Sequence, residues 1–190
     1  MSLFRNRFFL SLVVLAGLGI GMVASWAILD TAFHATADYE FCSSCHAYAP
    51  IAAAYREDTH GGNNEVGFRA AFNYFHLPHD NSLHYFLVKA KHGIVDPTME
   101  ILKEPHEIDW QGIRERREEF VYDSSCLECH KYLQEATEGS RMAFRAHRRY
   151  FEKPGTRTCV GCHENVGHNR LGYHLEKMGW KKPEEEEEEQ

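Results

Sequence analysis

The chain has 190 residues, 43% hydrophobic and 26% charged, so its length allows one modest domain plus an anchor and excludes a large multidomain enzyme. The formal net charge is −7, but the run of six glutamates near the end accounts for most of it and leaves about −1 for the rest. A basic nucleic-acid footprint is therefore not supported, whereas 13 histidines and six cysteines are unusual in so short a chain.

Residues 8–29 form an uncharged apolar run that is long enough to cross the hydrocarbon core of a bilayer as one helix. The alternative, a cleaved signal peptide, is disfavoured because the run exceeds a usual signal-peptide core and no convincing small-residue cleavage site ends it. Arg5 and Arg7 precede the run and Asp30 follows it, so the positive-inside rule places residues 1–7 in the cytoplasm. We predict a single-pass signal-anchor in the bacterial inner membrane, with the N-terminus inside and the remaining chain in the periplasm.

Helix and loop signals, and almost no strand signals, fill the chain after this anchor. Asp96-Pro97 and Pro154-Gly155 are helix-ending pairs, and Asp109 is a suitable helix N-cap. We expect helices over residues 83–94, 109–122 and 140–153. No second apolar run of spanning length occurs in the sequence, so we predict one domain over residues 30–175 and a disordered acidic tail over residues 176–190.

Every cysteine belongs to a Cys-x-x-Cys-His motif, the pattern of c-type haem attachment. Two thiols at this spacing can each form a thioether to the macrocycle, and the adjacent histidine reaches the iron as its proximal ligand. Zinc would not explain a histidine after every second cysteine, and no cysteine is left for a disulfide framework once three haems are placed. The three motifs are Cys42, Cys45 and His46; Cys126, Cys129 and His130; and Cys159, Cys162 and His163.

Three covalent haems limit the kind of fold that the domain can have. About 150 ordered residues around three macrocycles are too few for a conventional apolar core, so the haems themselves must form the core. We therefore predict a mostly α fold with extensive loops that supply iron ligands and cover the porphyrin faces. Haem attachment takes place outside the cytoplasmic membrane in bacteria, which agrees with the predicted topology of the anchor.

Ten histidines lie outside the motifs, while three haems need at most three distal iron ligands. His147 shares a helical face with Phe144 and Phe151, so it points towards an apolar surface, and a haem face is such a surface. A packed core histidine is the alternative for this position. His168 lies five residues after the third motif, and it can ligate a neighbouring haem if the loop folds back.

Further short patterns flank the haem motifs, namely Glu40-Phe41, Thr59-His60, Gly67-Phe68-Arg69-Ala70, Asp123-Ser124 and Thr158. With them, the chain resembles the NapC/NirT family of membrane-anchored tetrahaem quinol dehydrogenases, and its NrfH-like members in particular, over most of its length. The resemblance implies His60, His147 and His168 as distal iron ligands, with the alternative that one of them is left over from a haem that this chain lacks. Members of this family commonly carry methionine at the place of Tyr48, and its absence here leaves His46 as the expected proximal ligand of the first haem.

The segment from Phe72 to Pro78 stands where the family carries another haem motif followed by an aliphatic residue and proline. Phe72 and Phe75 replace both cysteines, whereas His76 and its proline remain. The resemblance makes this segment a degenerate haem site, which turns a four-haem plan into a three-haem one with aromatic rings filling part of the vacated volume. A non-covalent haem on His76 is the disfavoured alternative, because nothing would fix the porphyrin.

Residues 89–96 resemble the family segment that places a lysine and a carboxylate beside the first haem, in a quinol pocket. The resemblance implies Lys89 and Asp96 at that pocket, whereas without it an ordinary solvated helix face is the better interpretation. A quinol gives up two electrons and two protons, so its oxidation needs a protonatable side chain beside a haem edge. Asp96 fits the proton role and Lys89 can orient the quinol oxygen, with His92 as the alternative for either role.

Our leading hypothesis is a trihaem cytochrome that carries electrons between the quinone pool and a periplasmic redox partner, itself expected to contain haem. If the chain acts as an enzyme, it is a quinol dehydrogenase. The alternative hypothesis is an electron-relay subunit of a larger membrane respiratory or photosynthetic complex, without its own quinol site. A self-contained oxyanion reductase has no support in the sequence, since nothing indicates an open haem within a substrate pocket.

Overall fold

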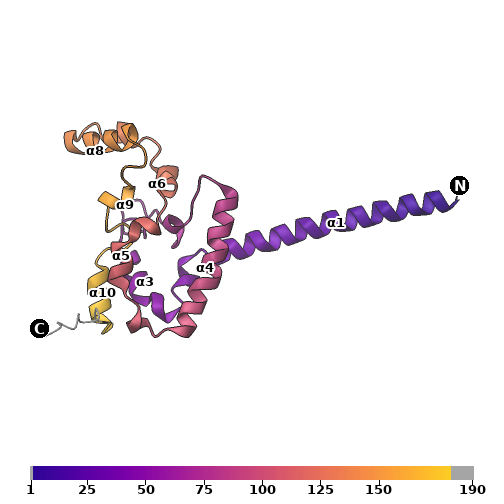
Figure 1. Ribbon diagram of the computed structural model, residues 1–190, viewed down its shortest axis with the longest axis horizontal. Coiled ribbons are helices and arrows are strands. Elements are labelled where there is room, and N and C mark those ends of the chain that lie inside the picture. The colour runs from indigo at the N-terminus through magenta and orange to yellow at the C-terminus, as the bar shows by residue number, and fades with distance from the viewer. Residues whose placement is uncertain (1, 181–190) are drawn as a thin grey trace, which may run out of the picture. The chain divides into compact units, whose positions relative to one another are not determined.

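The computed structural model describes residues 2–180 and divides into two units, Met1–Ala37 and Asp38–Gln190. The first unit consists of helix α1 (Ser2–Ala35), which Figure 1 shows as one uninterrupted helix. Its segment Asn6–Ala35 is long and apolar enough to cross a membrane, by length and composition. The large hydrophobic side chains from Phe8 to Leu29 are 47–73% exposed, a surface suited to lipid. Helix α1 ends at Ala35, so it continues beyond residue 29, where the apolar run ends.

The second unit is built from short helices joined by loops. Within residues 38–180 no strand occurs, and the chain has one isolated antiparallel bridge, between Gly61 and Arg69. This architecture confirms the predicted mostly α fold. The helices of the unit are α2 (Tyr39–Cys42), η1 (His46–Tyr48), α3 (Ala49–Glu57), η2 (Tyr74–His76), α4 (Ser82–Leu102), η3 (Pro105–Glu107), α5 (Trp110–Glu115), η4 (Arg117–Glu119), α6 (Asp123–Cys129), α7 (Leu133–Ala136), α8 (Arg141–Glu152), α9 (Cys159–Cys162) and α10 (Leu171–Lys177).

Side-chain caps mark the starts of several of these helices. Asp109 accepts a hydrogen bond from the backbone N–H of Gly112 at the start of α5, as its position predicts, and Ser140 caps α8 in the same way. Helix α8 matches the helix expected over residues 140–153. The helix expected over residues 109–122 is wrong in length, because the chain leaves the α conformation at Arg116 and continues as the 3₁₀ turn η4.

Helix α4 corrects the expectation that Asp96-Pro97 would end it. The helix continues through Pro97 to Leu102, although proline lacks an N–H and its ring crowds the carbonyl of Gly93, four residues earlier. A tertiary contact holds the extra turns in place. The Glu100 carboxylate accepts hydrogen bonds from the backbone N–H groups of His46, at 2.8 Å, and Ala47, at 3.0 Å. This contact couples the end of α4 to the first haem motif.

The apolar core of the second unit is small. Buried Ala54, Leu171 and Leu175 form its centre, where α3 packs against α10 (Figure 1), and Trp110 and Trp180 pack around them. A core of this size is consistent with a domain in which prosthetic groups supply much of the buried apolar volume. Trp180, which packs against this core, belongs to the tail that was expected over residues 176–190. Residues 181–190 of that predicted tail lie outside the described residues.

Candidate functional site

Six histidine side chains face one another in three pairs of nearly equal separation. A metal–imidazole bond is about 2.0 Å long and the ring centre lies about 1 Å beyond the nitrogen, so two imidazoles on opposite sides of one iron have centroids about 6 Å apart. The three pairs fit this requirement for a haem iron with two histidine ligands. The centroid distances are 6.3 Å for His60–His130, 6.1 Å for His147–His163 and 6.1 Å for His76–His168.

The first pair joins the histidine of the motif at α6 to the loop that follows α3. The His60 ring nitrogen Nδ1 lies 3.1 Å from the Oδ1 atom of Asp58, and the same oxygen accepts the His60 backbone N–H at 2.8 Å. Burial alone would raise the pKa of Asp58, but the hydrogen bonds from His60 outweigh it and lower that pKa. A carboxylate behind Nδ1 orients the ring and leaves Nε2 as the nitrogen suited to bind a metal, on the ring that faces His130.

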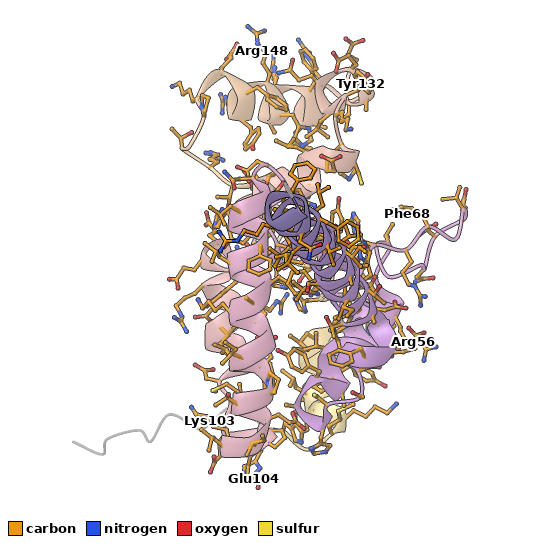
Figure 2. The ribbon with its side chains drawn as sticks, turned by 90° about the vertical axis from the view of Figure 1, so that its right-hand side faces the viewer. Arg56, Phe68, Lys103, Glu104, Tyr132 and Arg148 are labelled. Carbon is orange, nitrogen blue, oxygen red and sulfur yellow. The ribbon has the colours of Figure 1, made fainter. Side chains whose placement is uncertain are left out.

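The second pair joins α8 to the histidine that follows α9. The His147 and His163 rings are nearly parallel, with an interplanar angle of 13°. Burial lowers the pKa of His147, and His163 and His130 add to this effect, which favours the neutral imidazole that binds iron. The opposite face of α8 is solvated: Figure 2 shows Arg148 pointing outward, and this side chain pairs with Glu152 at 2.7 Å.

The second and third haem motifs lie against each other. The thiols of Cys126 and Cys159 form a hydrogen bond, so one attachment point of each motif is in contact with the other. Asp123 ties the two motifs together, because its Oδ1 atom accepts the backbone N–H of Cys159 at 2.8 Å and its Oδ2 atom accepts the Tyr150 hydroxyl at 2.7 Å. Sequence reasoning noted Asp123 as part of a pattern but missed this connecting role.

The first haem motif lies along one face of α4. Lys89 is only 5% exposed, and its charge interacts with Cys42 and Asp96. Burial lowers the pKa of Lys89, while those two groups oppose the shift. The Asp96 carboxylate lies 3.4 Å from Nδ1 of His92 and accepts a hydrogen bond from the Tyr48 hydroxyl. The structure thus brings the three predicted quinol-site residues, Lys89, His92 and Asp96, beside the first motif.

Tyr48 and Glu100 are two residues of this site that sequence reasoning did not assign to it. Burial raises the pKa of Tyr48, and Asp96 adds to the shift through charge and hydrogen bonding, so the phenol stays protonated as a donor to the carboxylate. The signal for Tyr48 was its departure from the family methionine. Glu100 was detectable from its helical spacing, one turn after Asp96.

His46 differs from the other motif histidines in its ring contact. Its ring lies 5.4 Å from that of Trp180, at an interplanar angle of 75°. In the described part of the chain, no histidine stands opposite His46 at the 6 Å separation found for the other pairs. The surroundings of the first motif therefore differ from those of the second and third, with a carboxylate, a lysine and a tyrosine close by.

The segment from Phe72 to Pro78 contributes one histidine to the third pair. His76 faces His168, so the structure places His168 opposite this segment and not opposite a Cys-x-x-Cys-His histidine. Burial lowers the pKa of both rings, that of His168 to about 4, which favours the neutral form of each imidazole. Phe72 packs edge-on against Tyr55, at a centroid distance of 5.1 Å, and Phe75 packs edge-on against His60, at 5.2 Å.

Comparisons with known proteins find similar c-type cytochromes. The family described as "NapC/NirT cytochrome c family, N-terminal region" matches residues 4–173. Cytochrome c-type protein NapC of Paracoccus pantotrophus is 26% identical, over 95% of this chain and 79% of that protein. TorC of Escherichia coli K12 is 25% identical over 82% of this chain, but this chain spans only 42% of that protein.

A solved structure is similar as well. It is the cytochrome c nitrite reductase NrfHA complex bound to the inhibitor HQNO, and one of its chains matches with a TM-score of 0.54 and 26% identity. The match covers 83% of this chain and 91% of that chain. The likeness therefore includes nearly the whole of the solved chain.

Proposed function

Because the chain belongs to the NapC/NirT cytochrome c family, we propose that it is a membrane-anchored trihaem cytochrome that oxidises quinol and passes the electrons to a periplasmic redox protein. The observation that carries this proposal is the cluster of Lys89, Asp96 and Tyr48 against the first haem motif. An alternative, an electron-relay subunit without a quinol site, would not need a buried lysine and a carboxylate at that place.

Covalent haem c suits the residues of all three Cys-x-x-Cys-His motifs. The histidine pairs His60–His130 and His147–His163 would hold two of the irons, and His46 would reach the third. Haem supplies one-electron redox chemistry when bound. The contact between Cys126 and Cys159 supports close approach of the second and third attachment sites, which suits electron transfer between them.

Proton handling is the task of the protein at the proposed quinol site. A quinol that loses two electrons also loses two protons, and Asp96 is the base that accepts a proton from the quinol hydroxyl. Tyr48 donates to Asp96 and fixes its orientation, while His92, 3.4 Å from the same carboxylate, can pass the proton onward. Lys89 orients a quinol oxygen by donating a hydrogen bond to it, because a lysine ammonium group can donate hydrogen bonds but cannot accept them.

The anchor explains how this domain meets its substrate. Quinols reside in the bilayer, so a redox domain held by a spanning helix collects them without leaving the membrane surface. We propose that α1 is an uncleaved signal-anchor with its N-terminus in the cytoplasm and the haem domain in the periplasm. The excess of arginine before the apolar run supports this orientation.

The electron acceptor is proposed to be a periplasmic haem protein in a complex with this chain. Support comes from the solved relative, which was captured in the NrfHA complex of a nitrite reductase. The basic outer face of α8, which carries Arg148, suits an acidic surface on such a partner.

The test is anaerobic quinol oxidation by the full chain purified in detergent. A menaquinol or ubiquinol analogue is added while the haem α-band is followed, and HQNO serves as the inhibitor. We expect rapid reduction that Asp96→Asn slows by about 10²- to 10⁴-fold, the usual contribution of a catalytic acid or base. The control is Asp80→Asn, an exposed aspartate outside the site, which keeps the wild-type rate.

A failure of quinol to reduce the haems would contradict the proposal. If neither quinol reduces the haems while dithionite reduces them fully, the quinol dehydrogenase proposal is wrong. The relay-subunit function then becomes the better one, and a stable stoichiometric complex with a larger membrane assembly is the result to look for.

A further inference from the structure

The His76–His168 pair has the geometry of the two histidine pairs at the haem motifs, although no cysteine accompanies it. Its centroid distance is 6.1 Å and its interplanar angle 61°, against 6.3 Å and 67° for His60–His130. Two histidines of a merely degenerate site have no reason to keep the separation that a shared iron requires. The likeness in both distance and angle indicates that the iron position has been retained while the thioethers have been lost.

The surroundings of His76 prepare it as a metal ligand. Its Nδ1 atom lies 2.8 Å from the carbonyl oxygen of Phe120, to which it donates. This fixes the tautomer with an unprotonated Nε2, the state in which a histidine binds iron, and it matches the way that Asp58 holds Nδ1 of His60. The Tyr122 backbone N–H also donates to the carbonyl of Phe75, at 3.1 Å, which fixes the backbone next to His76.

His168 is held opposite by a tight loop. Its backbone N–H donates to the Asn165 carbonyl at 3.0 Å, and the Asn165 side chain accepts a hydrogen bond from Arg114. Gly167 adopts a φ of 72°, a conformation that only glycine takes without strain, and so turns the chain towards His76. The buried Nδ1 atom of His168 has no hydrogen-bond partner in the described chain.

The two phenylalanines also contact rings of the neighbouring sites. The Phe72 ring packs against Tyr55, and its centroid lies 6.4 Å from that of Tyr48, which is beside the first motif. Phe75 contacts His60, the proposed ligand opposite His130. The segment from Phe72 to His76 thus extends from the first haem motif to the His60–His130 pair. A redox centre at His76 would lie between these two sites. Without such a centre, electrons would have to cross a longer gap between them.

We propose that His76 and His168 bind the iron of a fourth haem, a non-covalent haem b with two histidine ligands. Phenylalanine cannot form a thioether, so this haem keeps both vinyl groups and is held by its iron ligands and by apolar packing. The inference builds on the proposed function, since it adds a centre to the same electron path. It stands or falls on haem content, which is independent of whether quinol is the electron donor.

The experiment counts covalent and extractable haem in the full chain purified in mild detergent. Total haem is measured against protein, acidified organic solvent extracts the non-covalent fraction, and mass spectrometry under denaturing conditions counts the covalent haems. We expect four haems per chain, of which three are covalent and one is extracted as haem b. Three haems in total with none extracted would overturn the proposal.

Two histidine variants locate the extractable haem. His76→Ala and His168→Ala should each lower it from one per chain to nearly zero, with three covalent haems retained and one low-spin bis-histidine signal lost. The matched control is His106→Ala, an exposed histidine, which keeps one extractable haem. Extractable haem that persists in both variants would be adventitious and would also overturn the proposal.

A second change keeps the test decisive if those variants fold poorly. The double variant Phe72→Cys and Phe75→Cys restores a Cys-x-x-Cys-His motif at the same place. We expect the fourth haem to become covalent, so that the chain mass gains one haem, the extractable fraction disappears and the total stays at four. A total that rises from three to four would mean that the wild-type site is empty.

Discussion

The region around the second and third haem motifs differs from the region around the first in what stands opposite the motif histidine. His130 and His163 each face a histidine at about 6 Å, whereas His46 contacts Trp180. The polar groups around the first motif include Lys89 and Asp96, which belong to α4, and Tyr48, which is hydrogen-bonded to Asp96. The paired region is suited to hold and pass electrons, and the first region has the groups needed to handle protons.

This difference teaches how a small domain separates two kinds of chemistry. Two neutral imidazoles would fill both positions that a porphyrin leaves on its iron, so that no position would remain for a substrate, which suits a relay centre. A substrate that gives up protons with its electrons needs titratable side chains within hydrogen-bond reach, and Asp96 and Lys89 supply them. Variants that exchange the features of the two regions should therefore change electron transfer and quinol chemistry separately.

The largest effect is expected from removing one ligand of a histidine pair. His147→Ala should abolish one complete low-spin bis-histidine signal in electron paramagnetic resonance and convert that iron to a high-spin form. The physical reason is that alanine cannot replace the sixth ligand opposite His163. His106→Ala is the control, and an unchanged low-spin signal in His147→Ala would break the distinction between the two regions.

A smaller effect is expected from the buried lysine of the first region. Lys89→Met should lower kcat/KM for quinol by about 10- to 100-fold, the equivalent of one charged hydrogen bond of about 1.5–3 kcal/mol. The low-spin signals of the paired region should not change. Lys103→Met is the matched control, because Lys103 follows the end of α4 that is farther from α8 (Figure 2). Equal losses of kcat/KM in both variants would refute a specific role for Lys89.

The same lysine predicts a pH dependence. Burial lowers the pKa of Lys89, so its ammonium form is lost at a lower pH than that of an exposed lysine. As the pH rises through that lowered pKa, KM for quinol should increase in the wild type. Stopped-flow titration measures this, and the rise should be absent from Lys89→Met; a parallel rise in both would assign the titration to another group.

A change in stability is expected at the contact between α4 and the first motif. Glu100→Ala leaves the N–H groups of His46 and Ala47 without their carboxylate acceptor, at a cost of about 2 kcal/mol. This corresponds to a fall in Tm of about 4–8 °C for a domain of this size, measured by circular dichroism on the haem-loaded chain. Glu104→Ala, at an exposed residue two positions after the end of α4, should leave Tm unchanged, and similar shifts in both would argue against the contact.

The smallest effect is expected from the hydroxyl of Tyr48. Tyr48→Phe removes the hydrogen bond to Asp96 and should lower kcat for quinol by about 2- to 10-fold, as expected for a neutral hydrogen bond of about 0.5–1.5 kcal/mol. Tyr132→Phe, an exposed tyrosine, is the control. A loss as large as that of Asp96→Asn would mean that Tyr48 does more than position the carboxylate.

The sequence by itself determined the features that depend on a few neighbouring residues. The haem motifs are chemical units of five residues, the apolar run is a continuous stretch, and the caps Asp109 and Ser140 act within one helical turn. The family resemblance, which rests on the same local patterns, is confirmed by the match over residues 4–173. Local chemistry of this kind does not depend on how the rest of the chain folds.

Only the tertiary structure decided which distant groups meet. His168 follows the third motif in the sequence, yet it faces His76, because Gly167 and Arg114 direct its loop there. Local rules end α4 at Pro97, but the hydrogen bonds from His46 and Ala47 to Glu100 carry the helix on to Leu102. Both outcomes depend on contacts between segments far apart in the chain, and such contacts have no local pattern from which they can be deduced.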